Sequence, residues 1–120
     1  MVISKNCYAT TFSTTSDYRI KQNQKEIDLE IYNIDNLKPK IYDNILSNNK
    51  DIGFIAHELQ EEFPFLVKGE KDGQEYQNIN YNPIIALLVK ELQEQKKEIS
   101  NLKIEIKEQK NEINNLKNIF

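Results

Sequence analysis

The chain has 120 residues, a net charge of −3 and 29% charged residues, which suits one small domain and provides no basic surface for nucleic acid. Its single cysteine and single histidine exclude an internal disulfide and a Cys/His metal cluster, and we expect neither a metal nor another cofactor. No apolar run is long enough to span a membrane, and no signal peptide follows Met1.

Residues 1–15 have the character of a segment end or a linker, because a weakly β-prone stretch gives way to a run of serine and threonine. Ser16 and Lys21 follow, five residues apart. A serine hydroxyl becomes a good nucleophile only when a base takes its proton, and a lysine amine can be that base where burial or a nearby cation favours its neutral form. On spacing alone, a turn-capping serine and a solvated lysine are the simpler interpretation.

The next segments predict a small head of short helices and antiparallel strands. Apolar residues at Ile27, Ile31 and Ile34 indicate a helix of about three turns, which Pro39 ends. Gly53 marks a bulge or a close approach of backbone, within a strand apolar enough to be covered on both faces. In chain order we expect a strand at 40–42, a strand at 52–56, a helix at 57–63, a strand at 65–67 and its antiparallel partner at 75–79.

A single long helix is predicted from Asn82 to the end of the chain. Asn82 is a favourable N-cap, and Pro83 is preorganised for the first helical position. Ile84 and Leu87 lie beside the main apolar stripe, so we expect the head to pack on this end of the helix. Apolar residues then alternate at spacings of three and four, which is the period of a coiled-coil seam. The a and d positions are Ile85, Leu88, Leu92, Gln95, Ile99, Leu102, Ile106, Gln109, Ile113, Leu116 and Phe120.

The flanking charges indicate a parallel assembly of identical chains. Each g position is glutamate and each following e position is lysine, which places opposite charges together when the helices run parallel and in register. The pairs are Glu91–Lys96, Glu98–Lys103, Glu105–Lys110 and Glu112–Lys117. Isoleucine at a with leucine at d favours two strands, whereas Gln95 and Gln109 interrupt that pattern at d, so dimer and trimer both stay open.

Five motifs in the order of the chain, spanning about residues 12–95, resemble those of a known family. They are Ser16-Asp17-x-Arg19-x-Lys21-x-Asn23, Leu37-x-Pro39-x-x-Tyr42, Gly53-Phe54-Ile55-Ala56-x-Glu58, Phe63-Pro64-x-x-Val67 and Tyr76-x-x-Ile79-x-Tyr81. Together they resemble the C-terminal intramolecular chaperone domain of phage endosialidases and other viral tailspikes and fibres. The same self-cleaving domain occurs in the myelin regulatory factor. This chain departs from the family at His57, where glutamine is common, and at Gln24, where isoleucine is common.

The resemblance implies a homotrimer, with a dimer as the alternative, that helps an upstream β-rich passenger to fold and then releases itself. By resemblance, Ser16 is the nucleophile, Lys21 is the base and the bond between Thr15 and Ser16 is the one that is cut. The domain would act in the host cytoplasm during virion assembly, or stay on the virion if it is not released. Supporting residues carried over from the first motif are Asp17, Arg19 and Asn23.

We therefore expect an α+β protein in three parts. Residues 1–15 would be the end of the passenger or a linker, residues 16–82 the chaperone and self-processing head, and residues 83–120 the helix of a parallel trimeric coiled coil. We expect neither nucleic acid nor a membrane as a partner. Two alternatives are a trimerisation module of a viral fibre that never cuts, and a Ser/Lys hydrolase that acts on other molecules.

Overall fold

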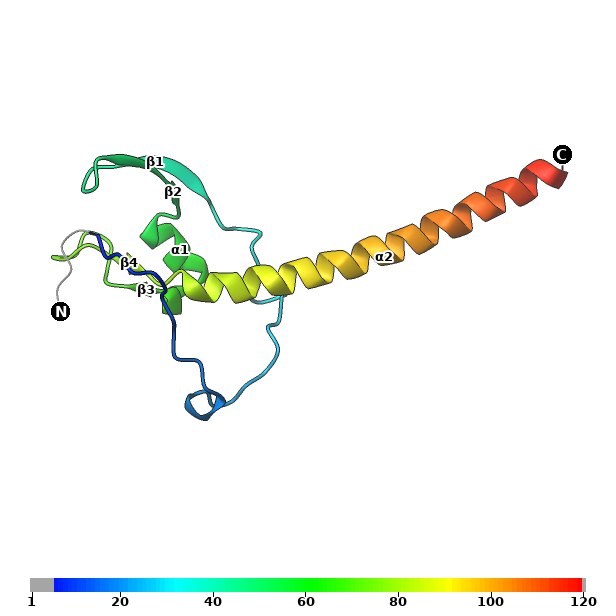
Figure 1. Ribbon diagram of the computed structural model, residues 1–120. Coiled ribbons are helices and arrows are strands. Elements are labelled where there is room, and N and C mark those ends of the chain that lie inside the picture. The colour runs from blue at the N-terminus through cyan, green and yellow to red at the C-terminus, as the bar shows by residue number, and fades with distance from the viewer. Residues whose placement is uncertain (1–5, 120) are drawn as a thin grey trace.

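The computed structural model describes residues 6–119. They form an amino-terminal arm (residues 6–24), a small head and a long carboxyl-terminal helix, within 76 × 40 × 32 Å (Figure 1). This arrangement confirms the predicted class, an α+β head followed by a long helix. The expectations for residues 1–5 and for Phe120 lie outside the described residues. The elements are η1 (Tyr18–Ile20), β1 (Lys40–Asn44), β2 (Asn49–Gly53), α1 (Ala56–Glu62), η2 (Pro64–Leu66), β3 (Val67–Lys68), β4 (Asn78–Ile79) and α2 (Asn82–Ile119).

Two antiparallel pairs of strands form the β part of the head. β1 pairs with β2, with Lys40 opposite Gly53, and β3 pairs with β4, with Val67 opposite Ile79. The second strand lies earlier than the predicted 52–56, and it is not covered on both faces, because Ile52 is 72% exposed. Most of the predicted strand at 65–67 is instead the 3-10 turn η2, which begins at a proline whose fixed φ suits a helical turn.

The core of the head is a cluster of six buried apolar side chains. The continuous segment from α1 through η2 to the first residue of β3 supplies four of them, and the first two turns of α2 supply the other two. Burying such side chains contributes about 1.5–3 kcal/mol each before the entropic cost of ordering the chain. The head therefore packs on the start of the long helix, as predicted. The buried residues are Leu59, Phe63, Leu66, Val67, Ile84 and Leu87.

The predicted helix over residues 24–37 is wrong, although two of its apolar residues do reach the core. Ile27 and Ile34 pack against the buried cluster, but the backbone between them forms turns. Asp28 accepts a hydrogen bond from the N–H of Glu30 at 2.9 Å, and Asn33 accepts one from the N–H of Asp35 at 3.1 Å. Such short polar side chains compete with helical hydrogen bonds for the backbone. Residues 24–37, which we call the strap, therefore pack against the head without forming a helix.

The β1–β2 hairpin is attached to the rest of the head at its open end, through both strands. In β1, Lys40 Nζ donates a hydrogen bond to a carboxylate oxygen of Glu58 in α1 at 2.9 Å, and this hydrogen bond is the main cause that lowers the pKa of Glu58. In β2, opposite Lys40, Gly53 lies so close to Tyr81 that an added Cβ would be 2.7 Å from the tyrosine Oη. Tyr81 Oη also accepts a hydrogen bond from the N–H of Phe54 at 3.3 Å. The predicted close backbone approach at Gly53 is confirmed.

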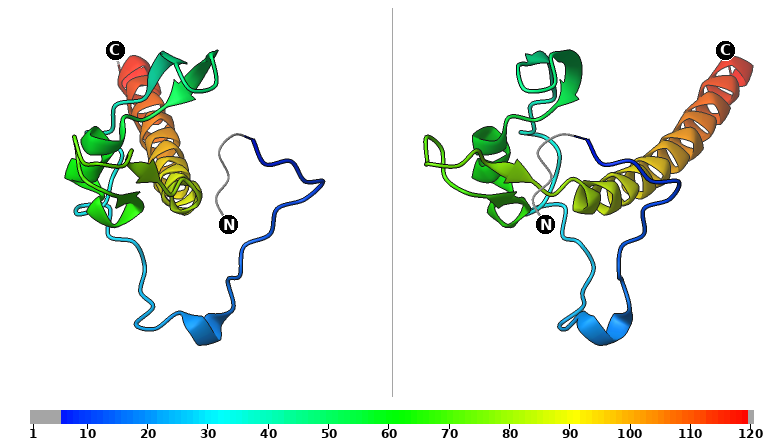
Figure 2. Two further views of the ribbon diagram at one scale, coloured as in Figure 1. Left: turned by 90° about the vertical axis from the view of Figure 1, so that its left-hand side faces the viewer. Right: turned by 60° about the vertical axis from the view of Figure 1, so that its left-hand side comes forward.

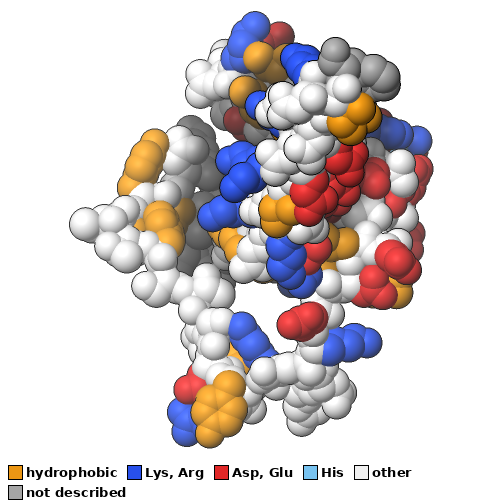
Figure 3. All heavy atoms as spheres, turned by 90° about the vertical axis from the view of Figure 1, so that its right-hand side faces the viewer, with side chains coloured by type: hydrophobic (Ala, Val, Ile, Leu, Met, Phe, Trp, Pro, Cys, Tyr) orange, Lys and Arg blue, Asp and Glu red, His pale blue; other side chains and the backbone are white. Residues whose placement is uncertain are grey.

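Helix α2 is about 57 Å long at 1.5 Å per residue, and most of it extends beyond the head (Figure 1). It begins at Asn82, as predicted, and its apolar seam residues from Ile99 to Leu116 are 50–55% exposed. Figure 3 looks at the carboxyl-terminal end and shows hydrophobic side chains between basic and acidic ones. None of the helices within residues 6–119 has the length and apolarity that a bilayer crossing requires.

Candidate functional site

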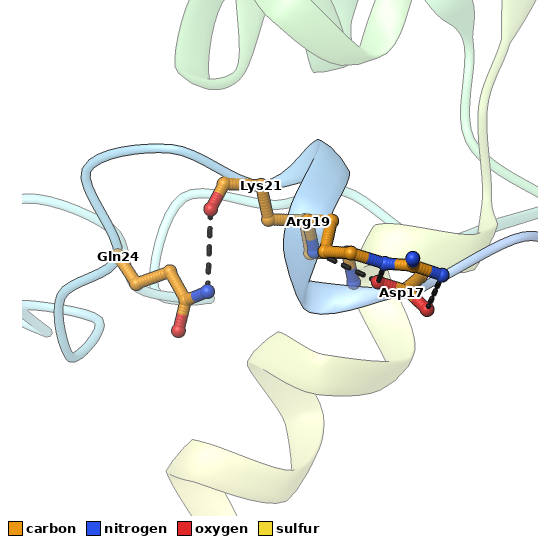
Figure 4. A network of polar contacts seen from close by, with 4 residues as sticks. All are labelled: Asp17, Arg19, Lys21 and Gln24. Carbon is orange, nitrogen blue, oxygen red and sulfur yellow. Dashed lines mark hydrogen bonds and ion pairs between the residues drawn. The ribbon is translucent and has the colours of Figure 1, made fainter.

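The candidate residues lie at the bend of the arm, which stands away from the head and from α2 in both views of Figure 2. Asp17 caps the short turn η1 by accepting a hydrogen bond from the backbone N–H of Arg19 at 2.9 Å. The guanidinium of Arg19 donates two further hydrogen bonds to the same carboxylate, at 2.9 and 3.1 Å (Figure 4). The two residues therefore hold the turn as a bidentate ion pair.

The turn brings Ser16 and Lys21 together. Backbone hydrogen bonds within it run from the N–H of Ile20 to the carbonyl of Asp17 and from the N–H of Lys21 to the carbonyl of Tyr18, both at 3.1 Å. Lys21 Nζ then donates a hydrogen bond to Ser16 Oγ. Both side chains are exposed in the single chain. A nucleophile in contact with a potential base is the arrangement that proton transfer from a hydroxyl requires.

Asn23 contributes through its backbone. Its φ of 54° lies in the left-handed region, which asparagine tolerates better than most residues. The chain turns there, and the amide of Gln24 donates a hydrogen bond back to the carbonyl of Lys21 at 3.2 Å (Figure 4). This hydrogen bond restrains the backbone of Lys21, the candidate base, on its carboxyl-terminal side.

The charges around η1 are paired with each other. The pKa of Asp17 is lowered, first by the side-chain hydrogen bond from Arg19 and then by the backbone N–H of the same residue. The same hydrogen bond raises the pKa of Arg19. Asp17 is therefore ionised at neutral pH and acts as an anchor for the turn, not as a proton donor to Ser16 or Lys21.

Sequence reasoning missed one contact of the candidate cleavage segment. The side-chain amide of Asn82 donates a hydrogen bond to Thr14 Oγ1 at 3.3 Å, across 68 positions in the chain. Thr14 directly precedes Thr15, and Asn82 is the first residue of α2. The sequence pattern identified Asn82 only as a helix start, and no local signal pairs it with Thr14.

The residues predicted to form the coiled-coil seam lie along α2, away from the arm. Their apolar members form a stripe along the helix that is 45–64% exposed in the single chain. Within residues 6–119 no three His, Cys, Asp or Glu side chains are grouped so that they could hold a metal ion. The predicted seam residues in the described part are Ile85, Leu88, Leu92, Gln95, Ile99, Leu102, Ile106, Gln109, Ile113 and Leu116.

An apolar hollow of about 570 Å³ lies on the head, between the strap and the start of α2. Ile31, Phe65 and Leu87 are among its lining residues, whereas Ser16 and Lys21 are not. The candidate nucleophile is therefore exposed at a bend of the chain and is not set in this hollow.

Comparison with known proteins relates this chain to one family and to phage fibre proteins. Residues 16–68 match a family model described as chaperone of endosialidase, and the match begins at Ser16. The chain is also 36% identical over 98 residues to the long tail fiber protein Gp37 of Enterobacteria phage M1, and equally to that of Enterobacteria phage Ox2. Each alignment covers 73% of this chain but only 38% of the relative. The chain thus spans well under half the length of these relatives.

Proposed function

The chain contains a domain of the chaperone-of-endosialidase family, and we propose on this basis that it is an intramolecular chaperone that releases itself by cutting the bond between Thr15 and Ser16. The family consists in general of self-cleaving serine peptidase domains. The passenger would be a β-rich fibre segment upstream in the same polypeptide, as the likeness to tail fibre proteins suggests. Assembly would take place in the host cytoplasm, before or during attachment of the fibre to the virion.

The observation that carries the proposal is the hydrogen bond from Lys21 Nζ to Ser16 Oγ, at the residue where the family match begins. In the proposed reaction, Ser16 Oγ attacks the carbonyl carbon of Thr15, and Lys21 takes the hydroxyl proton. That proton passes to the nitrogen of Ser16 as the peptide bond breaks and an ester forms. Water then hydrolyses the ester, which frees the carboxylate of Thr15 and a new amino terminus at Ser16.

Assembly is proposed to control this reaction. Three copies joined in parallel along the a and d positions of α2 would bring three arms to one end of the coiled coil. Tyr18 and Ile20 on η1 are 75% and 63% exposed, so packing between copies would bury apolar surface beside Ser16 and Lys21. Removing water there favours a neutral amine, which can act as a base. Holding the groups together supplies effective concentrations that reach about 10⁵ M or more.

The direct test is to incubate the purified chain and search for a new amino terminus at Ser16. We expect Ser16→Ala and Lys21→Ala each to abolish cutting, because one removes the nucleophile and the other the base. Lys25→Ala, which removes an exposed lysine four residues after Lys21, is the matched control and should cut normally. Mass spectrometry of the intact chain and amino-terminal sequencing of the product give the readout.

The outcomes separate the proposal from its two rivals. A wild-type chain that trimerises and stays intact over days supports a registration module that never cuts. Multiple turnover on added peptides supports a hydrolase of other molecules. Cutting at the wild-type rate in Lys21→Ala would show that Lys21 is not the base.

A further inference from the structure

One hydrogen bond connects the arm to the body of the molecule. Among the described residues, the contact between Asn82 and Thr14 at 3.3 Å is the hydrogen bond that joins residues 6–24 to any later element. It is made by the first residue of α2, the helix that carries the proposed coiled-coil seam. Its partner is the residue directly before Thr15, whose carbonyl is the proposed point of attack.

The proposed scissile bond therefore lies between two fixed points. On its carboxyl side, the ion pair of Asp17 with Arg19 and the turn η1 fix the chain. On its amino side, Asn82 fixes Thr14. An attacking oxygen and a carbonyl carbon react efficiently only when they are held about 3–3.5 Å apart and aligned. Because the Thr15 carbonyl carbon is bonded to the Ser16 nitrogen, its distance to Oγ depends on the rotations φ and χ1 of Ser16, and holding the chain on both sides of the bond restricts φ.

We propose that Asn82 is a positioning residue for self-cleavage, which holds Thr14 and so presents the Thr15 carbonyl to Ser16 Oγ. This inference rests on the proposed function. It has two consequences. The reaction is faster with a hydroxyl at position 14, which is a specificity for the second residue before the cut. It also requires the first turn of α2, so that forming the long helix and preparing the bond for cutting are one event.

The test measures the rate of self-cleavage in variants that remove the contact without removing the helix start. Thr14→Val keeps the shape of the side chain but loses the hydroxyl, whereas Thr14→Ser keeps the hydroxyl. Asn82→Ser keeps a small polar residue that suits a helix start, but its side chain is too short to reach Thr14. We expect Thr14→Val and Asn82→Ser to slow cutting about three- to tenfold, as for the loss of one neutral hydrogen bond, and Thr14→Ser to restore most of the rate.

Two further readouts distinguish positioning from general damage. The double variant of Thr14→Val with Asn82→Ser should cut no more slowly than the slower single variant, because both changes remove the same contact. In each variant the maximal rate of cleavage should fall, but the midpoint of its pH dependence should stay the same, because Ser16 and Lys21 are unchanged. Thr11→Val, an exposed threonine on the same arm, is the matched control and should leave the rate unaltered.

Equal cutting by wild type, Thr14→Val and Asn82→Ser would overturn the inference and leave the proposed function standing. Independent, multiplying effects of the two single changes would also overturn it. A wild-type chain that never cuts would contradict both this inference and the proposed function. Folding does not confuse these outcomes, because Thr14 is exposed on the arm and its variants leave the core of the head intact.

Discussion

Asp17 and Arg19 hold the turn that presents Ser16 and Lys21. The sequence motif suggested only that the pair supports the site, and the structure shows the support to be a bidentate contact on a capped 3-10 turn. Because the pair lies at the surface, its contribution is local order and not overall stability. Loss of the ion pair should therefore disorder the turn η1 and leave the stability of the whole protein nearly unchanged.

The pH response of Asp17 tests this pair. Its folded pKa lies below the ordinary value because Arg19 donates to the carboxylate. The contribution of the ionised carboxylate is therefore present above the unfolded pKa, and it is lost as the pH falls through the lowered, folded pKa. An NMR titration of the side-chain carboxyl should give a midpoint below that of an ordinary aspartate, and Arg19→Ala should raise it.

Lys25→Ala removes a nearby positive charge without touching the pair, so it should leave the midpoint of Asp17 where it is in the wild type. Identical midpoints in wild type and Arg19→Ala would mean that the two side chains do not meet in solution.

At the scale of elements, the hairpin β1–β2 is fitted against the residue that precedes α2. Gly53 ends β2, and its missing side chain leaves room for the hydroxyl of Tyr81, with the hydroxyl of Tyr42 also close. Tyr81 in turn receives the N–H of Phe54. The start of the long helix is thus in contact with the hairpin as well as with the buried cluster.

Gly53→Ala should lower the free energy of unfolding by about 1–3 kcal/mol, the usual cost of overpacking. Its Cβ would be 2.7 Å from Tyr81 Oη, so the ring must move and its hydrogen bond with Phe54 is lost. In a Tyr81→Phe background the same change should cost less, because that oxygen is absent. Urea unfolding at one fixed protein concentration measures both differences. Equal costs in the two backgrounds would place the strain elsewhere.

At the scale of the whole molecule, the head is small and the helix is long. Six buried side chains form the centre of the head, while α2 exposes an apolar stripe, interrupted by two glutamines, beyond it. A long helix obtains most of its stability from packing its apolar face, and a head of this size gains much from association. We therefore expect neighbouring copies to cover the stripe.

Replacing Leu102 and Ile106 with aspartate should break the proposed trimer, because it places charges at d and a in the middle of the seam. Sedimentation should show a monomer, and self-cleavage should stop. Ser100→Asp with Asn114→Asp adds the same charge at b positions, which face away from the seam, and should preserve both assembly and cutting. Continued cutting by a demonstrated monomer would contradict the dependence on assembly.

Much of this protein follows from its sequence alone. The heptad spacing identified the long helix, and Asn82 and Pro83 located its start, because both are properties of neighbouring residues. The motif from Ser16 to Asn23 predicted the candidate site, which stays a prediction, and the family match to residues 16–68 agrees with the resemblance on which it rests. The number of copies stays a prediction, since isoleucine and leucine at a and d point to two strands and the resemblance points to three.

Other features depended on contacts between distant residues. The apolar stripe Ile27, Ile31 and Ile34 predicted a helix, yet the segment is a strap, because Asp28 and Asn33 bind its backbone while the core takes two of its isoleucines.

The hydrogen bond between Asn82 and Thr14 also spans most of the chain. Local patterns report the period of an element and the residues that begin or end it. Only the tertiary structure decides which side chains from distant segments meet, because that choice is made by packing around a shared core.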